Sequence, residues 1–205
     1  MTRVAILISG KGSNMLHLCQ SMIKEKYAKP VLVLSDQKCA KGLRLAEDLG
    51  IKVKYIDPFQ YKNNKDSFDK KIVKELKDVQ ADLICLAGFM RILSPYFITQ
   101  FSNNIINIHP SLLPKYKGLN THSRAFESQD KEAGCTVHRV TKKIDDGLIL
   151  GQASVPISTS ENPASLAEKV LRLEHVLYPI VLKRLINKKV IHYDYNNQNL
   201  SLIHI

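Results

Sequence analysis

Two polar side chains, Asn107 and His109, close an otherwise apolar segment near the middle of the chain. An asparagine amide offers an uncharged N–H donor, which suits an oxyanion that forms on a carbonyl carbon. A histidine ring exchanges a proton near neutral pH. If residues 104–108 form a strand, both side chains point to the same side, because side chains alternate along a strand. The pair, followed by Pro-Ser-Leu-Leu-Pro, predicts carbonyl chemistry assisted by a proton carrier.

A carboxylate further along the chain is a candidate third member of this site. The segment Asp145-Asp146-Gly147 lies between two predicted strands. A carboxylate close to His109 would raise the pKa of the imidazole and orient the ring. Asp-Asp-Gly is also typical of a plain turn between strands. Sequence spacing does not decide between these two interpretations.

The first turn of the chain, residues 10–14 (Gly-Lys-Gly-Ser-Asn), could hold a phosphate. It lies between a predicted strand and a predicted helix, and the backbone N–H groups at a helix start attract anions. Met15 stands where the dinucleotide-binding fingerprint has its third glycine, and the Gly-Lys-Ser/Thr ending of a P-loop is missing. The turn therefore disfavours an NAD or ATP site. A small phosphate ester and a plain tight turn both stay open.

The hydrophobic pattern predicts the sheet that must position these residues. Short apolar runs predict buried strands over residues 3–9, 30–35, 51–56, 82–87 and 104–108. Helical spacing predicts helices over residues 15–24, 40–49, with Gly50 as a stop signal, and 65–79. This alternation is typical of an α/β fold with a mostly parallel sheet and helices on both faces. Ligands of such sheets bind beyond the carboxyl ends of the strands.

The rest of the chain adds elements to the same domain. Ser94 and Pro95 predict a helix start, with serine as N-cap and proline at the first helical position. Residues 110–120 are predicted as an ordered loop. The further predicted elements are a helix over 121–128, strands over 135–140 and 148–155, and a long helix over 165–186. We expect one domain over residues 1–186 and a C-terminal tail over residues 187–205.

Composition limits the class of protein. The 205 residues are 44% hydrophobic, which fits a globular domain with a sizeable core. The net charge of +11 could attract anionic partners, but the lysines are scattered, and a solvated surface is the simpler interpretation. The four cysteines form no CxxC pair, which suits a reducing cytoplasm. No apolar run approaches the roughly 20 residues of a membrane span, and no histidines show metal-ligand spacing, so we expect no metal.

Four separated motifs, in this order, resemble the folate-dependent phosphoribosylglycinamide formyltransferases. The motifs are residues 8–14 (Ile-Ser-Gly-Lys-Gly-Ser-Asn), 86–95 (Leu-Ala-Gly-Phe-Met-Arg-Ile-Leu-Ser-Pro), 107–118 (Asn-Ile-His-Pro-Ser-Leu-Leu-Pro-Lys-Tyr-Lys-Gly) and 145–147 (Asp-Asp-Gly). The likeness extends from the N-terminus to about Ile186. It implies a Rossmann-like single domain that transfers the formyl group of 10-formyltetrahydrofolate to the amine of glycinamide ribonucleotide, in purine biosynthesis.

The resemblance also implies a role for each matching residue. Asn107, His109 and Asp145 would form the catalytic set, with Asp145 preferred to Asp146 because the family pattern is Asp-x-Gly. The residues implied to hold the ribonucleotide are Gly12, Ser13, Asn14, Met15 and Glu174. Those implied to contact the folate, besides Asn107 and Asp145, are Lys65, Met90, Arg91, Ile92, Leu93, Thr141, Lys142, Lys143 and Ile144.

The implied chemistry agrees with the residue types. Asn107 and a protonated His109 would both donate to the oxyanion, and a carboxylate at Asp145 would favour the protonated ring. His109 or an ordered water would supply the proton that the departing folate nitrogen needs.

Three positions depart from the family pattern. Lys65 stands where arginine is frequent near the folate, so the charge is kept but the bidentate fork is lost. Asn120 replaces a frequent histidine, and Leu171 stands where a polar residue often faces the ribonucleotide. These departures affect the details of binding rather than the reaction.

Three alternative functions stay open. Methionyl-tRNA formyltransferase shares the Asn-x-His-Pro-Ser-Leu-Leu-Pro core but normally carries a second domain for tRNA. A formyl-folate hydrolase usually adds an N-terminal regulatory domain, and we expect neither addition here. A non-catalytic nucleic-acid-binding module would need clustered basic and aromatic residues. We therefore expect small-molecule substrates, no nucleic acid, no membrane partner, a cytoplasmic location, and a monomer or homodimer.

Overall fold

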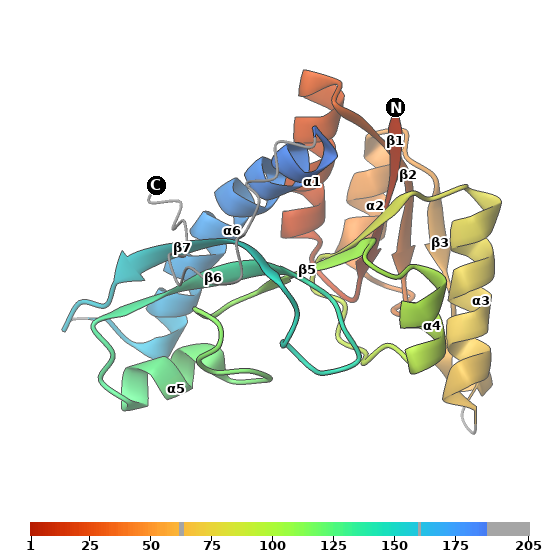
Figure 1. The fold of residues 1–205 in the computed structure, drawn as a ribbon. Coiled ribbons are helices and arrows are strands. Elements are labelled where there is room, and N and C mark those ends of the chain that lie inside the picture. The colour runs from red at the N-terminus through yellow and green to blue at the C-terminus, as the bar shows by residue number, and fades with distance from the viewer. Residues whose placement is uncertain (62–63, 160, 188–205) are drawn as a thin grey trace.

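A seven-stranded mixed sheet forms the centre of the molecule, shown in the computed structural model of Figure 1. The structure describes residues 1–61, 64–159 and 161–187, except for the side chain of Lys65. The strands are β1 (Thr2–Ile8), β2 (Ala28–Ser35), β3 (Val53–Tyr55), β4 (Leu83–Leu86), β5 (Ile105–His109), β6 (Glu132–Arg139) and β7 (Ile149–Pro156). Their order is β3-β2-β1-β4-β5-β6-β7. The first five strands are parallel, and β6 runs antiparallel to both of its neighbours.

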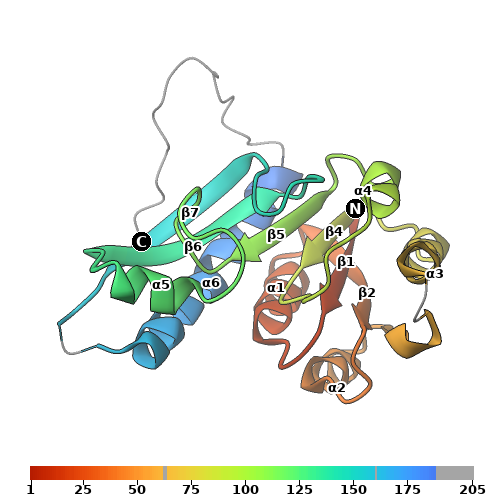
Figure 2. The ribbon, with the colours of Figure 1, turned by 90° about the horizontal axis from the view of Figure 1, so that it is seen from below.

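Helices cover both faces of this sheet, as an α/β fold requires. One face packs in a single core with α1 (Ser13–Glu25), α2 (Lys41–Asp48) and α6 (Pro163–Ile186). The other face packs with α3 (Lys65–Asp78) and α4 (Pro95–Gln100) in a second core. Figure 2 shows α1 and α6 along one side of the sheet and α4 on the other. A further helix, α5 (Thr121–Glu127), and a short 3-10 helix, η1 (Pro58–Tyr61), complete the fold.

The predicted fold class is confirmed, and each predicted boundary lies within three residues of the observed one. The start of α4 follows its sequence signal, because Ser94 accepts a hydrogen bond from the Phe97 N–H at 3.2 Å and Pro95 begins the helix. Gly50 follows the cap of α2 with a φ of 70°, which favours glycine. The 3-10 helix η1 was not predicted. The C-terminal tail, apart from Asn187, lies outside the described residues.

The long helix α6 starts two residues earlier than its hydrophobic spacing predicts. Asn162 is the N-cap, and its side chain accepts hydrogen bonds from the N–H groups of Ala164 and Ser165. The hydroxyl of Ser165 in turn accepts from the Asn162 N–H. This reciprocal capping box satisfies backbone donors at the helix start. It fixes the entry of the helix that carries Glu174 and Tyr178.

Alternation along β5 separates core residues from polar ones. Ile106 and Ile108 pack in the core that contains α1 and α6. Asn107 and His109 therefore face the opposite side of the sheet. There, the loop after β5 is tied to the neighbouring strands, because Leu113 donates its N–H to Thr136 Oγ1 and accepts from Gln152 Nε2.

Candidate active site

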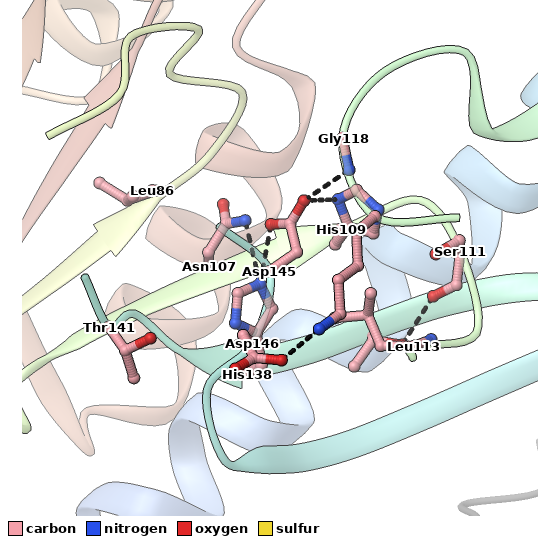
Figure 3. Close-up of polar contacts among 12 residues, drawn as sticks. Leu86, Asn107, His109, Ser111, Leu113, Gly118, His138, Thr141, Asp145 and Asp146 are labelled. Carbon is pink, nitrogen blue, oxygen red and sulfur yellow. Dashed lines mark hydrogen bonds and ion pairs between the residues drawn. The ribbon is translucent and has the colours of Figure 1, made fainter. Parts of the chain in front are cut away.

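Asn107 and His138 occupy paired positions on β5 and β6 (Figure 3). The Nδ1 atom of His138 lies 2.8 Å from the Arg139 carbonyl, which can only accept, so Nδ1 carries a hydrogen. In the neutral ring Nε2 is then an acceptor, and it takes a hydrogen bond from Asn107 Nδ2 at 3.2 Å. One N–H of the Asn107 amide is thereby held, and the second is left to donate to a bound molecule.

Both ring nitrogens of His109 lie near acceptor oxygens. Its Nε2 lies 2.9 Å from the Tyr116 carbonyl, so this nitrogen carries a hydrogen. Its Nδ1 lies 3.3 Å from Oδ2 of Asp145. A proton taken up by His109 must therefore bind Nδ1, between the ring and the carboxylate.

Asp145 links the two histidines (Figure 3). Its Oδ2 accepts the Gly118 N–H at 2.9 Å, and its Oδ1 lies 3.6 Å from His138 Nε2. Burial pushes the pKa of Asp145 up, but a hydrogen bond that His138 Nε2 can donate only when its ring is protonated, the Gly118 N–H and the charge of a protonated His109 more than offset this, and the net pKa lies below 3.8. Asp145 is therefore a carboxylate at neutral pH.

The backbone around Asp145 is built to carry it. Asp145 has a φ of 48°, a left-handed conformation that aspartate adopts more readily than most residues. Gly147 approaches β6 so closely that a Cβ atom there would lie 1.8 Å from the Arg139 carbonyl oxygen. The Asp-Asp-Gly segment is thus a turn between strands and also supplies the carboxylate near His109. Both interpretations of this segment from the sequence therefore hold.

Asp146 has different partners. Its carboxylate pairs with Lys117 and lies 3.9 Å from Lys143 Nζ. Arg124 of α5 steadies the same loop, because it donates to the Lys117 carbonyl at 2.7 Å and stacks over the Tyr116 ring. Two peptide groups of this loop, at Tyr116 and Gly118, thereby hold His109 and Asp145.

Burial decides the pKa of His109. Removal from water lowers the pKa, the Tyr116 carbonyl and Asp145 raise it, and the nearby His138 and Arg124 lower it again. The net pKa lies below 6.5. Asp145 thus raises the pKa of the ring as expected, but burial outweighs that contribution, so the neutral ring predominates at pH 7 in the free protein.

The first turn forms the start of α1. Gly12 is the N-cap with a φ of 75°, and a Cβ there would lie 2.5 Å from the Cα of Gly42. No side chain caps this helix, so the N–H groups of Ser13, Asn14 and Met15 point out from its first turn. The Met15 side chain is fully buried, which leaves only its backbone to contact a ligand.

Asn14 and Glu174 meet although they are 160 positions apart in the sequence. Asn14 Nδ2 donates to Glu174 Oε2 at 2.6 Å, and both residues are buried. Burial raises the pKa of Glu174 to about 7, against a smaller lowering by Asn14. The Oδ1 atom of Asn14 is buried without a hydrogen-bond partner. These two side chains form a buried polar pair that joins α1, at the first turn, to α6.

The predicted folate-contacting residues divide by exposure. Met90, Ile92 and Ile144 are 71%, 60% and 54% exposed. Leu93 is buried in the core with α3 and α4. The guanidinium of Arg91 lies 4.7 Å from the Phe68 ring centroid. The side chain of Lys65 lies outside the described residues.

The loop between β6 and β7 carries the other predicted folate contacts. Thr141 bonds within this loop, with its hydroxyl donating to the Lys143 carbonyl at 3.1 Å. Lys142 lies in the same exposed segment. Of the three departures from the family pattern, Asn120 is the N-cap of α5 and Leu171 is partly exposed on α6.

Sequence reasoning left His138 without a role. The signal was present, because β6 alternates and residues 136 and 138 face away from the core residues Cys135 and Val137. The register with β5 was not readable from the sequence. The backbone contacts of Tyr116 and Gly118 had no side-chain signature at all.

Within the described ranges, no group of three or more His, Cys, Asp or Glu residues is arranged to hold a metal ion. None of the described helices is both long and apolar enough to span a bilayer. The four cysteines are free thiols.

The family model, a relative and a solved structure that match this chain are all formyl transferases. Residues 2–182 match the family model described as formyl transferase. The chain is 37% identical to phosphoribosylglycinamide formyltransferase of Escherichia coli (strain K12), over 87% of this chain and 84% of that protein. Among solved structures, glycinamide ribonucleotide transformylase 1 from Symbiobacterium toebii superposes with a TM-score of 0.90 at 35% identity, covering 94% of this chain and 91% of that one.

Larger proteins contain a similar segment. The trifunctional purine biosynthetic protein adenosine-3 of Gallus gallus is 42% identical over 88% of this chain. The chain spans 18% of the length of that relative.

Proposed function

The chain belongs to the formyl transferase family, and we propose that it transfers the formyl group of 10-formyltetrahydrofolate to the amine of glycinamide ribonucleotide. The products are formyl-glycinamide ribonucleotide and tetrahydrofolate, a step of purine biosynthesis. The observation that carries this proposal is the convergence of Asn107, His109 and Asp145 at one point of the sheet.

Asn107 stabilises the oxyanion. When the amine attacks the formyl carbon, the carbonyl oxygen gains negative charge. The free N–H of the Asn107 amide donates to that oxygen, while His138 holds the other N–H. A donor held in place before the reaction requires little reorganisation as charge develops.

His109 carries the proton. The attacking amine gains a positive charge and must lose one proton, and neutral His109 accepts it at Nδ1. Asp145 then stabilises the imidazolium, because its Oδ2 lies 3.3 Å from that nitrogen. The Nδ1–H of the protonated ring, shared between Asp145 and the oxyanion, returns the same proton to the leaving nitrogen as the bond to the formyl carbon breaks. One proton is moved, and none is gained or lost.

The ribonucleotide phosphate binds at the start of α1. The uncapped N–H groups of Ser13, Asn14 and Met15 and the tight approach of Gly12 form a cradle suited to an anion. Glu174, which bonds Asn14 of this turn, would contact the ribonucleotide, as the resemblance to the family implies.

The folate binds against exposed apolar side chains. Met90, Ile92 and Ile144 provide contact area for a flat aromatic ring system. Arg91, Lys142, Lys143 and the position of Lys65 supply positive charge for its carboxylate tail. When bound there, the folate supplies the activated formyl group, and the residues of the chain orient it.

The test is a spectrophotometric assay of folate release from 10-formyltetrahydrofolate. Glycinamide ribonucleotide, charged initiator tRNA and an amine-free control are run side by side. We expect release only with glycinamide ribonucleotide. Release that needs tRNA would indicate tRNA formylation, and release without any amine would indicate hydrolysis. No release together with a salt-sensitive affinity for nucleic acid would contradict catalysis altogether.

We further propose a cytoplasmic location, where the free thiols stay reduced. A domain over residues 1–186 and a tail from residue 187 stay predictions, as does a monomeric or homodimeric state.

A further inference from the structure

Tyr178 reaches the catalytic strand from the reverse side of the sheet. This tyrosine of α6 is fully buried, and α6 packs on the face opposite to Asn107 and His109. Its hydroxyl lies 3.1 Å from the Leu86 carbonyl and 3.1 Å from the Ile106 carbonyl. These carbonyls belong to neighbouring parallel strands, β4 and β5.

The two carbonyls lie where the reaction is proposed to occur. Leu86 is the last residue of β4 and pairs in register with Asn107. The Ile106 carbonyl is part of the peptide bond that precedes Asn107. The segment that leaves β4 after Leu86 leads to Met90 and Ile92 on the proposed folate side. One hydroxyl thus contacts both the strand that carries the oxyanion donor and the strand that leads to the folate.

We propose that Tyr178 is a positioning residue for Asn107, holding the ends of β4 and β5 together so that the amide faces the formyl group at a fixed distance. This inference rests on the proposed formyl transfer. The hydroxyl has one hydrogen to share between two carbonyls, and each carbonyl has a second lone pair beyond its ladder bond. A loss of this donor leaves the fold in place but frees the end of β5.

The position of Tyr178 on α6 extends its role. Glu174 lies one helical turn earlier on the same helix and bonds Asn14 at the first turn. One helix therefore contacts both the proposed ribonucleotide site and the strand that carries Asn107. Burial raises the pKa of Tyr178 far above its usual range, so the hydroxyl keeps its hydrogen at neutral pH.

Tyr178→Phe tests the proposal, because it removes only the hydroxyl. We expect kcat to fall about tenfold, with the KM values for both substrates within twofold of wild type. NMR of the Asn107 side-chain amide should show shifted resonances in the variant without any substrate. A kcat within twofold of wild type, or unshifted Asn107 amide resonances, would overturn the inference.

Tyr27→Phe is the matched control. The Tyr27 hydroxyl bonds Ser21 Oγ at 3.2 Å, so its removal leaves the Tyr178 contacts with Leu86 and Ile106 in place, and kcat and the Asn107 resonances should not change. If Tyr178→Phe fails to fold, an NMR measurement on the wild-type protein still tests the contact of Tyr178 with β4 and β5. Its Tyr178 hydroxyl proton should appear as a slowly exchanging resonance close to the β4 and β5 backbone, and absence of that resonance would contradict the bridge.

The two proposals fail in different ways. If the wild-type protein shows no formylation activity, the proposed function is wrong, but the NMR comparison still tests whether Tyr178 positions Asn107. If the wild-type protein is active and Tyr178→Phe has the same kcat and the same Asn107 resonances, only the positioning role is wrong.

Discussion

Asn107 and His138 face each other across β5 and β6, and the Asn107 amide nitrogen donates to His138 Nε2 at 3.2 Å. His138 is itself fixed by the Arg139 carbonyl at 2.8 Å. The orientation of the Asn107 amide is therefore set by a histidine that need not touch any substrate. A group that holds an oxyanion donor affects the rate through geometry.

His138→Leu should lower kcat roughly 10- to 100-fold, because the Asn107 amide loses its acceptor and can turn away. The KM for glycinamide ribonucleotide should change little, as the first turn is untouched. His138→Gln keeps an acceptor at this position and should retain more activity than His138→Leu. Equal activities of the two variants in steady-state assays would exclude the orienting role.

Asn107→Ala and His109→Ala should each reduce turnover by at least about two orders of magnitude. Asn107→Ala removes the proposed oxyanion donor, and His109→Ala removes the proposed proton carrier. Thermal melts should show that both variants fold. Near-normal turnover in either variant would rule out the role assigned to that residue.

Asp145→Asn should lower kcat about 10- to 100-fold, because the imidazolium loses its counter-charge. Asparagine tolerates the left-handed backbone and can still accept the Gly118 N–H, so the loop should keep its shape. The pH dependence should move too, with the His109 pKa displaced further below 6.5, because the raising effect of Asp145 is lost.

Asp146→Asn is the matched control for this experiment. The neighbouring carboxylate pairs with Lys117 instead of a histidine, so its loss should change kcat by less than about threefold. Equal losses in Asp145→Asn and Asp146→Asn would mean that the loop, and not the Asp145 charge, supports the reaction.

Glu174→Gln should change how stability depends on pH. Burial raises the pKa of Glu174 from 4.5 to about 7, so the folded state holds this proton more tightly than the unfolded chain. The stabilisation is complete below pH 4.5 and is lost as the pH rises to about 7. Relative to wild type, the variant should therefore gain roughly 3 kcal/mol in the free energy of unfolding between pH 4.5 and pH 7.5.

Denaturant melts at several pH values measure this difference, and Glu75→Gln is the control. The pKa of Glu75 is lowered mainly by its hydrogen bond to Lys71, so its contribution is present at neutral pH and is lost on acidification. The two variants should thus shift in opposite directions. A difference between Glu174→Gln and wild type that does not vary with pH would contradict the buried, protonated carboxyl.

Most of the fold could be predicted from local sequence patterns. Apolar runs and caps such as Ser94-Pro95 depend on neighbouring residues, so their elements could be predicted within a few residues. The capping box at Asn162 moved the start of α6 because hydrogen bonds, and not hydrophobic spacing, set helix ends. The site was harder to predict from the sequence. The pairing of β5 with β6 is what brings Asp145 close to His109 and His138 close to Asn107.

The contacts that backbone groups make in the site could not be predicted from the sequence. The Tyr116 carbonyl and the Gly118 N–H act on His109 and Asp145 regardless of their own side chains. The balance of opposing effects on the His109 pKa was equally hidden, since it depends on burial that only the closed loops create.

Two imidazole rings face a single carboxylate at Asp145. This one carboxylate can balance the charge of one imidazolium, which in the proposed reaction is His109. Formyl transfer needs to store one proton between the attacking amine and the leaving nitrogen. In the proposed mechanism, the pair of His109 and Asp145 therefore takes up one proton and releases it once in each turnover.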